Sequence, residues 1–171
     1  VAPTAGRPPP VGTNITAGYR KNALRHLSQA TGFALEIPED PRHAMRGGFA
    51  LMDLSGTLRA LAIELSRVAN DFRLMDSGPM TGIGEMRMPP VQPGSSIMPG
   101  KVNPSMAEMV NMVCFQAIGC DTTILLAAQA GQLELNVMMP VMAHNLVHML
   151  EILSTAGDVF VRFCVVGLTA N

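Results

Sequence analysis

The stretch SMAEMVNMVCFQAIGCDTTILLAAQA, residues 105–130, decides the fold of this chain. Its only charged residues are Glu108 and Asp121, so the helix that it predicts has almost no water-facing side. A second helix of the same kind is predicted over about residues 137–166, and Pro140 should start or kink it. From Ser105 to residue 150 the one further charge is Glu134. Two such helices must be covered on every side.

The remaining chain is too short to provide that cover. It has 171 residues, about one domain's worth, of which 48% are hydrophobic and only 15% charged. This composition excludes intrinsic disorder and leaves few charges for the surface of a monomer. We therefore expect an all-α fold in which long helices join an intermolecular bundle. The 14 methionines fit this bundle as adaptable core filler, with a methionine-rich ligand surface as the alternative.

Two more helices are predicted upstream. Apolar residues recur at helical spacing after Thr16 until Gly32, and again from Leu51 to Phe72. Residues 33–41 between them are expected to form a brief extended or turn segment. Residues 1–16 are rich in proline and glycine and are expected to form an extended lead-in without chemistry. The predicted organisation is this lead-in, 1–16, followed by one helical domain, 17–171.

Several classes of function are disfavoured. The net charge is −1 without a basic block, so no nucleic-acid partner is expected. Residues 135–150 carry no charge but contain Pro140 and polar side chains, so no membrane span is expected there. His144 and His148 lack a third ligand nearby, so no metal site is expected. The three cysteines, at wide spacings in apolar stretches, are interpreted as reduced core thiols, namely Cys114, Cys120 and Cys164.

A long loop rich in glycine and proline, residues 77–104, carries the chemistry. Its segment GSSIMPGKVNP, residues 94–104, is called the signature loop below. Backbone N–H groups of such a loop can form a nest for a carboxylate, and Lys101 supplies a positive charge. A nucleotide-binding P-loop is not supported, because five residues separate Gly94 from Gly100 and Val102 follows the lysine.

The signature loop resembles the corresponding loop of the fumarase/aspartase superfamily. The resemblance runs from about residue 12 to Asn171 and includes LMDSGP at 74–79 and AGQLELNV at 130–137. It implies a mostly helical, cytoplasmic homotetramer whose core pools long helices from four subunits. It also implies elimination of ammonia or water from a small dicarboxylate (aspartate or malate) to give fumarate, without organic or metal cofactors.

The resemblance also implies roles for individual residues. Ser95 would abstract the proton, which requires backbone N–H groups of its own loop to stabilise the alkoxide. Ser96, Lys101 and Asn103 would bind substrate carboxylate oxygens. Glu108 would orient a neighbouring site histidine, although an acidic residue in the first turn of a helix has an equally good structural explanation. Supporting positions in and around the loop are Gly94, Met98, Gly100 and Glu108.

Part of the family pattern is missing. No Gly-x-Thr-His-x-Gln segment occurs, and residues 1–11 do not match relatives. The chain begins with Val1, so we expect a piece of a longer protein that is inactive by itself. The run PVQP at 90–93 and the AGQL at 130–133 favour an aspartate ammonia-lyase over a fumarate hydratase. A third alternative is an oligomerising helical module that has lost turnover.

Overall fold

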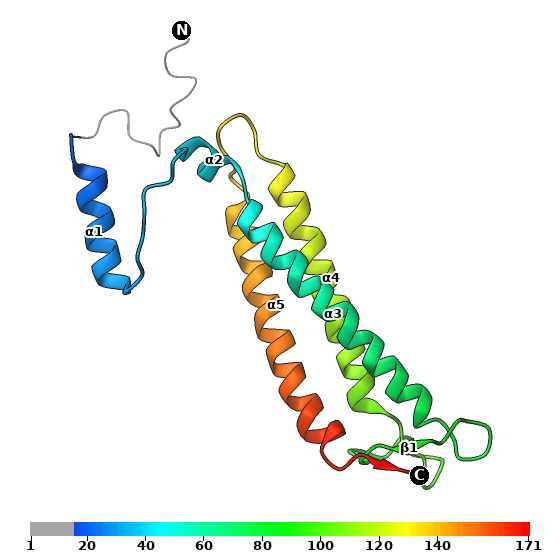
Figure 1. Ribbon diagram of the computed structural model, residues 1–171. Helices are drawn as coiled ribbons and strands as arrows, with labels where there is room; N and C mark the ends of the chain where they lie inside the picture. The colour runs from blue at the N-terminus through cyan, green and yellow to red at the C-terminus, as the bar shows by residue number, and fades with distance from the viewer. Residues whose placement is uncertain (1–15) are drawn as a thin grey trace.

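Three long helices lie side by side and form an elongated bundle (Figure 1). The computed structural model describes residues 16–171. The bundle consists of α3 (Phe49–Met75), α4 (Ser105–Gln129) and α5 (Met139–Phe160), and α5 continues into a π-helical turn, η2 (Val161–Val165). Pro140 lies in the first turn of α5, where its missing N–H costs no helical hydrogen bond. The predicted all-α architecture is confirmed.

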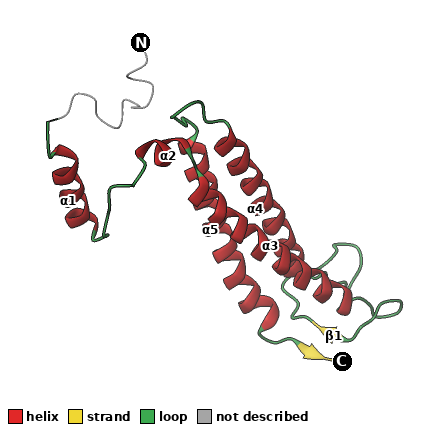
Figure 2. Cartoon of the chain, turned by 45° about the horizontal axis from the view of Figure 1, so that its top comes forward, coloured by secondary structure: helices red, strands yellow, loops and turns green. Residues whose placement is uncertain are grey.

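The N-terminal helix α1 (Tyr19–Thr31) stands away from the bundle (Figure 2). Gly32 ends it as predicted: its φ is 75°, and its N–H donates to the carbonyl oxygen of Ser28 at 2.9 Å. None of the residues of α1 is buried. Apart from residue 16, the lead-in predicted for residues 1–16 lies outside the described residues.

A short helix, α2 (Pro41–Arg46), begins at the last residue of the segment predicted to be extended or turn-like and continues over residues for which no element was predicted. The prediction missed it because six residues are too few to show a helical period. Asp40 starts this helix, since its carboxylate accepts from the backbone N–H of Arg42 at 2.9 Å.

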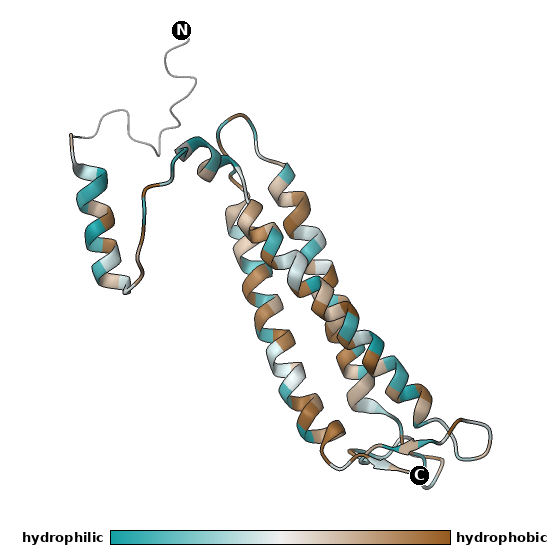
Figure 3. Ribbon diagram, viewed as in Figure 1, coloured by the Kyte–Doolittle hydropathy of each residue, from teal (hydrophilic) through white to brown (hydrophobic). Residues whose placement is uncertain are grey.

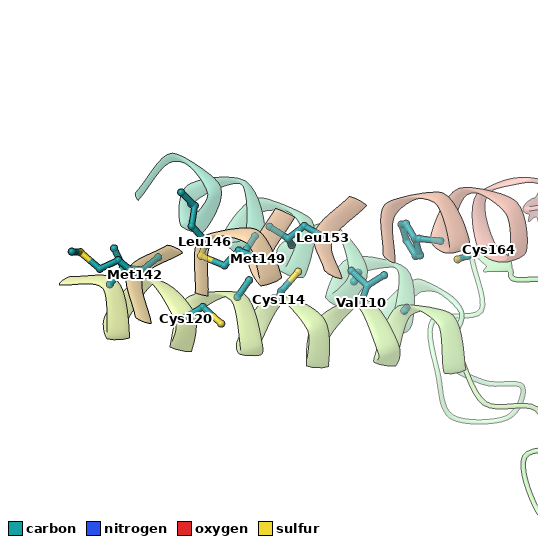
Figure 4. Packing of buried hydrophobic residues seen from close by; sticks show 14 of the residues in the cluster. Val110, Cys114, Cys120, Met142, Leu146, Met149, Leu153 and Cys164 are labelled. Carbon is teal, nitrogen blue, oxygen red and sulfur yellow. The ribbon is translucent and has the colours of Figure 1, made fainter. Parts of the chain in front are cut away.

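Helix α4 packs against both α3 and α5 and carries the largest share of the core (Figure 4). The buried side chains of α4 form a row along its length, and the buried row of α5 faces it. These rows comprise Ala107, Val110, Cys114, Ala117, Cys120, Ile124 and Ala127 from α4, and Met142, Leu146, Met149, Leu153 and Phe160 from α5. The opposite side of α4 stays uncovered, as Met112 and Phe115 show with 63% and 60% exposure.

Helix α3 approaches α4 through small side chains rather than through its leucines. Its buried residues are Ser55, Ala62, Ser66 and Ala69. The leucine-rich row predicted from residue 51 to residue 72 divides in two: Leu51, Leu58, Leu65 and Phe72 pack against the core, whereas Leu54, Leu61 and Val68 are exposed. Figure 3 shows apolar (brown) and polar (teal) residues interspersed along the helices of the bundle.

The long loop predicted for residues 77–104 contains one short strand. β1 (Met86–Arg87) pairs antiparallel with β2 (Thr169–Ala170), so the C-terminus closes on the start of the loop. Asn171 adds a bond from its side-chain amide to the carbonyl oxygen of Gly84 at 2.8 Å. This pairing joins segments more than 80 residues apart, which no local pattern indicates.

A buried charge lies between α3 and α4. Asp121 is 1% exposed, and its carboxylate accepts from Ser55 Oγ at 2.6 Å and from Arg59 Nη1 at 2.7 Å. Both partners come from α3, so the carboxylate joins the two helices. A buried charge is tolerated only when it is paired and hydrogen-bonded in this way.

Among the helices of residues 16–171, α4 is long and apolar enough to cross a membrane on length and composition. Core helices of bundles share that composition. Because α4 packs against two other helices and buries Asp121 and Asn111 against α3, we assign it to the bundle core.

Replacing Arg59 should destabilise the bundle. Arg59→Met leaves the buried Asp121 carboxylate with one hydroxyl donor, and we expect a loss of about 2 kcal/mol in the free energy of unfolding, because Arg59 is itself partly exposed. The matched control is Arg67→Met, which breaks the exposed pair with Glu64 and should cost less than about 0.5 kcal/mol. Urea denaturation measures both variants; equal losses would contradict the assignment.

The cysteines should resist alkylation in the folded protein. All three are buried and free, as predicted, and burial raises the pKa of the Cys114 and Cys164 thiols, with the charge of Asp76 adding to the effect at Cys164. We expect no iodoacetamide adduct at pH 8 in the native state and three adducts in urea, read by mass spectrometry. Rapid labelling of the native protein would contradict this packing.

Candidate active site

The signature loop lies at the end of the bundle that also holds the C-terminus (Figure 1). Its two ends are joined, since Pro93 and Val102 form an antiparallel bridge and the N–H of Gly94 donates to the carbonyl oxygen of Lys101 at 2.7 Å. The amide of Asn103 adds a long bond to the carbonyl oxygen of Gly94 at 3.4 Å. The backbone of the loop therefore forms a closed ring. We call its joined ends, residues 93–94 and 101–103, the neck of the loop.

Two glycines make this ring possible. A Cβ on Gly94 would lie 2.8 Å from the carbonyl oxygen of Lys101 and 3.0 Å from Asn103 Oδ1, which is closer than real contacts allow. Gly100 has φ 79°, a left-handed conformation that side chains disfavour. The supporting role expected for these glycines has a physical basis in the backbone.

The hydroxyl of Ser95 accepts two hydrogen bonds from within the loop. Ser95 Oγ accepts from the backbone N–H groups of Ile97 and Met98, each at 3.2 Å. Ser95 is half-buried. Two N–H dipoles aimed at one oxygen stabilise negative charge on it. The sequence analysis required N–H donors of this kind for a basic serine.

The other predicted loop residues are exposed or half-buried. Ser96, Met98 and Lys101 are exposed, and Asn103 is half-buried. The hydroxyl, the ammonium and the amide therefore remain accessible to a ligand. The neck fixes their backbone, because residues 94 and 101 are hydrogen-bonded to each other.

Glu108 lies in the first turn of α4 and is half-buried. Its carboxylate faces Arg73 of α3, with 3.8 Å between Glu108 Oε1 and Arg73 Nη2. Arg73 and its neighbour Asn111 were not predicted as site residues. The available signal for Asn111 was a single amide within an otherwise apolar helical face, whereas Arg73 looked like any surface arginine of α3.

The cavity under the loop is small. Asn103, Pro104 and Ser105 line it together with Met88 and Phe163, and its volume is about 10 Å³. This volume accommodates at most one water molecule, so a dicarboxylate would have to lie on the outer side of the loop. A substrate there needs further walls that these residues do not form.

The histidines lie away from the loop. His144 and His148 stack on α5 with ring centroids 6.2 Å apart. Within residues 16–171 no group of three histidine, cysteine or acidic side chains is arranged to hold a metal ion.

Comparison with known proteins identifies the class. A family profile described as "Lyase" matches residues 10–119, and the chain therefore belongs to this lyase family. The matched region contains α3, the signature loop and the first part of α4.

Individual relatives refine this assignment. Aspartate ammonia-lyase of Pseudomonas aeruginosa is 45% identical over 163 residues, which cover 94% of this chain and 34% of the relative. The Bacillus subtilis aspartate ammonia-lyase is 44% identical, with the same coverage. The chain spans about a third of the length of these curated relatives.

Solved structures agree in fold. A class II fumarase from Schistosoma mansoni matches with a TM-score of 0.83 and 39% identity, covering 94% of this chain and 36% of that one. A structure titled fumarate lyase:delta crystallin, from Brucella melitensis, matches with a TM-score of 0.83 and 46% identity, covering 90% and 36%. The helical bundle is therefore similar to the corresponding part of fumarate lyases.

A side chain at Gly94 should open the neck of the loop. In Gly94→Ala the new Cβ pushes against the Lys101 carbonyl and breaks the 2.7 Å hydrogen bond, so amide hydrogen exchange over residues 94–104 should become about tenfold faster. Gly157→Ala is the control, because a Cβ there meets nothing within 4 Å. Unchanged exchange in Gly94→Ala would show that the loop does not depend on this closure.

Proposed function

We propose that this chain is the central segment of a longer lyase that eliminates ammonia from L-aspartate to give fumarate. Residues 17–171 form its helical domain, with residues 94–104 as the signature loop. The similarity to aspartate ammonia-lyases along 94% of the chain supports the substrate. The Ser95 hydroxyl, which accepts two backbone N–H bonds, is the observation that carries the chemistry.

The reaction needs a base and stabilisation of developing negative charge. Removal of a proton from the carbon next to a carboxylate produces a dianion, after which the C–N bond breaks and ammonia leaves. Ser95, as the alkoxide, takes that proton. The Ile97 and Met98 N–H groups stabilise the alkoxide before the substrate binds.

The substrate carboxylates bind to the open side of the loop. Lys101 supplies charge, Ser96 supplies a hydroxyl and Asn103 supplies amide N–H groups. Gly94 and Gly100 shape the neck, Met98 places one of the N–H donors, and Glu108 orients a histidine contributed by another segment. We propose that the reaction needs no organic or metal cofactor.

The missing walls of the site come from other segments and other subunits. The small cavity below the loop and the exposed apolar sides of α3, α4 and α5 support this assembly. We propose a homotetramer in the cytoplasm whose central bundle covers these sides. The 171-residue chain alone is then inactive, since the remaining site segments lie outside it.

A second candidate is fumarate hydratase. The match to a class II fumarase with a TM-score of 0.83 favours it, because the same loop would serve either leaving group. The third candidate is a helical module without turnover. Aspartate, malate and fumarate given to the full-length protein distinguish the three by absorbance of the fumarate double bond.

Ser95→Ala should abolish turnover. With the base removed, we expect kcat on aspartate to fall about 10³-fold in the full-length protein that carries this chain, with little change in thermal stability. Ser28→Ala is the matched control: its hydroxyl, on α1, also accepts from a backbone N–H, that of Leu35 at 3.2 Å, and lies outside the loop. The proposal fails if Ser95→Ala retains activity or if the unmodified protein acts on none of the three acids.

A further inference from the structure

A polar cluster between α3 and α4 lies outside the signature loop, and apart from Glu108 its members have no assigned task. Ser66, Asn70 and Arg73 contribute to it from α3, and Glu108 and Asn111 from α4. These five residues are called the Asn111 cluster. Asn111 is 3% exposed, and its side-chain amide lies 2.9 Å from Ser66 Oγ and 2.8 Å from Asn70 Oδ1.

When its nitrogen faces Ser66, the Asn111 amide bonds to both Ser66 and Arg73 and gives up its donation to Asn70 Oδ1, which then lies 2.8 Å from the Asn111 oxygen. The nitrogen then donates to Ser66 Oγ at 2.9 Å and to the Ser66 carbonyl at 3.0 Å, and the oxygen accepts from Arg73 Nη1 at 3.1 Å. The other end of the same guanidinium faces Glu108 at 3.8 Å. Arg73 therefore links the first turn of α4 to a buried amide one turn further along.

This cluster lies where both ends of the long loop leave the bundle. Arg73 is three residues before Asp76, whose carboxylate accepts from the Met88 N–H at 3.0 Å in the first part of the loop. Asn111 is about 9 Å along the α4 axis from Ser105. The N–H of Ser105 donates to the carbonyl oxygen of Asn103 at 2.8 Å. The cluster thus holds the end of α3 and the start of α4 in one register, and with them Asn103.

We propose that Arg73 and Asn111 are positioning residues that fix the carboxylate-binding end of the signature loop, Lys101 and Asn103, for substrate. This inference rests on the proposed function. It concerns affinity rather than the chemical step, because the cluster connects to Asn103 through the start of α4. There the Glu108 N–H donates to the Pro104 carbonyl oxygen at 3.0 Å, and the Ser105 N–H donates to the Asn103 carbonyl oxygen at 2.8 Å. The hydroxyl of Ser95, by contrast, is held by its own N–H donors.

The chain contains a matched internal control. The pair Asp121–Arg59 also joins α3 to α4 through a buried polar group, about 15 Å further along α4 from Asn111. Loss of either link weakens the same interface between helices. Only loss of the Asn111 cluster should also disturb the position of the signature loop.

The test compares Arg73→Met, Arg73→Lys, Asn111→Leu and Arg59→Met in the full-length protein that carries this chain. We expect Arg73→Met and Asn111→Leu to raise KM for aspartate about tenfold while kcat falls less than threefold, which is the signature of lost uniform binding, affecting the bound substrate and the transition state equally. Arg73→Lys retains the charge and should recover part of the affinity. Arg59→Met should lower thermal stability without changing KM.

Hydrogen exchange supplies a readout that does not need turnover. Amides of residues 101–108 should exchange faster in Arg73→Met and Asn111→Leu but not in Arg59→Met. The inference is overturned if KM and exchange stay unchanged in the first two variants, or if Arg59→Met changes them equally. If the unmodified protein acts on none of the acids, the proposed function fails, and the exchange comparison alone decides the positioning role.

Discussion

The structure depends on the fact that α4 is long, rich in apolar residues and almost without charge, while this chain covers only part of its surface. Helices α3 and α5 bury one broad face of α4, and the side that bears Met112, Phe115 and Leu126 stays open. Apolar surface of that extent drives association, because water is released when it is covered. Helix α3 also has uncovered apolar side chains, since Leu54, Leu61 and Val68 are exposed.

This constraint explains why the candidate site is incomplete in one chain. The bundle supplies a rigid base, and the signature loop presents Ser95, Lys101 and Asn103 from its end. The loop closes on itself through Gly94 and Lys101, so its shape does not require a ligand. The walls around the substrate come with the covering helices. Assembly and activity are therefore coupled in the proposed lyase.

The sequence predicted those features that local chemistry controls. Pro140 starts α5, Gly32 ends α1 in a left-handed conformation, and the low charge of residues 105–130 predicts the central helix. The requirement for loop N–H donors at Ser95 followed from the weakness of serine as a base. The roles of the individual loop residues remain proposals, because they concern a substrate.

Other features depend on contacts that no local pattern contains. The division of the α3 leucines follows from which side α4 approaches, and α4 approaches the small residues Ser55, Ala62, Ser66 and Ala69. The β1–β2 pairing and the Arg73–Asn111 contact likewise join distant segments. Sedimentation velocity of the full-length protein that carries this chain tests the central claim most directly. The account predicts a particle of four subunits, and a monomer with the outer side of α4 still exposed to water would contradict it.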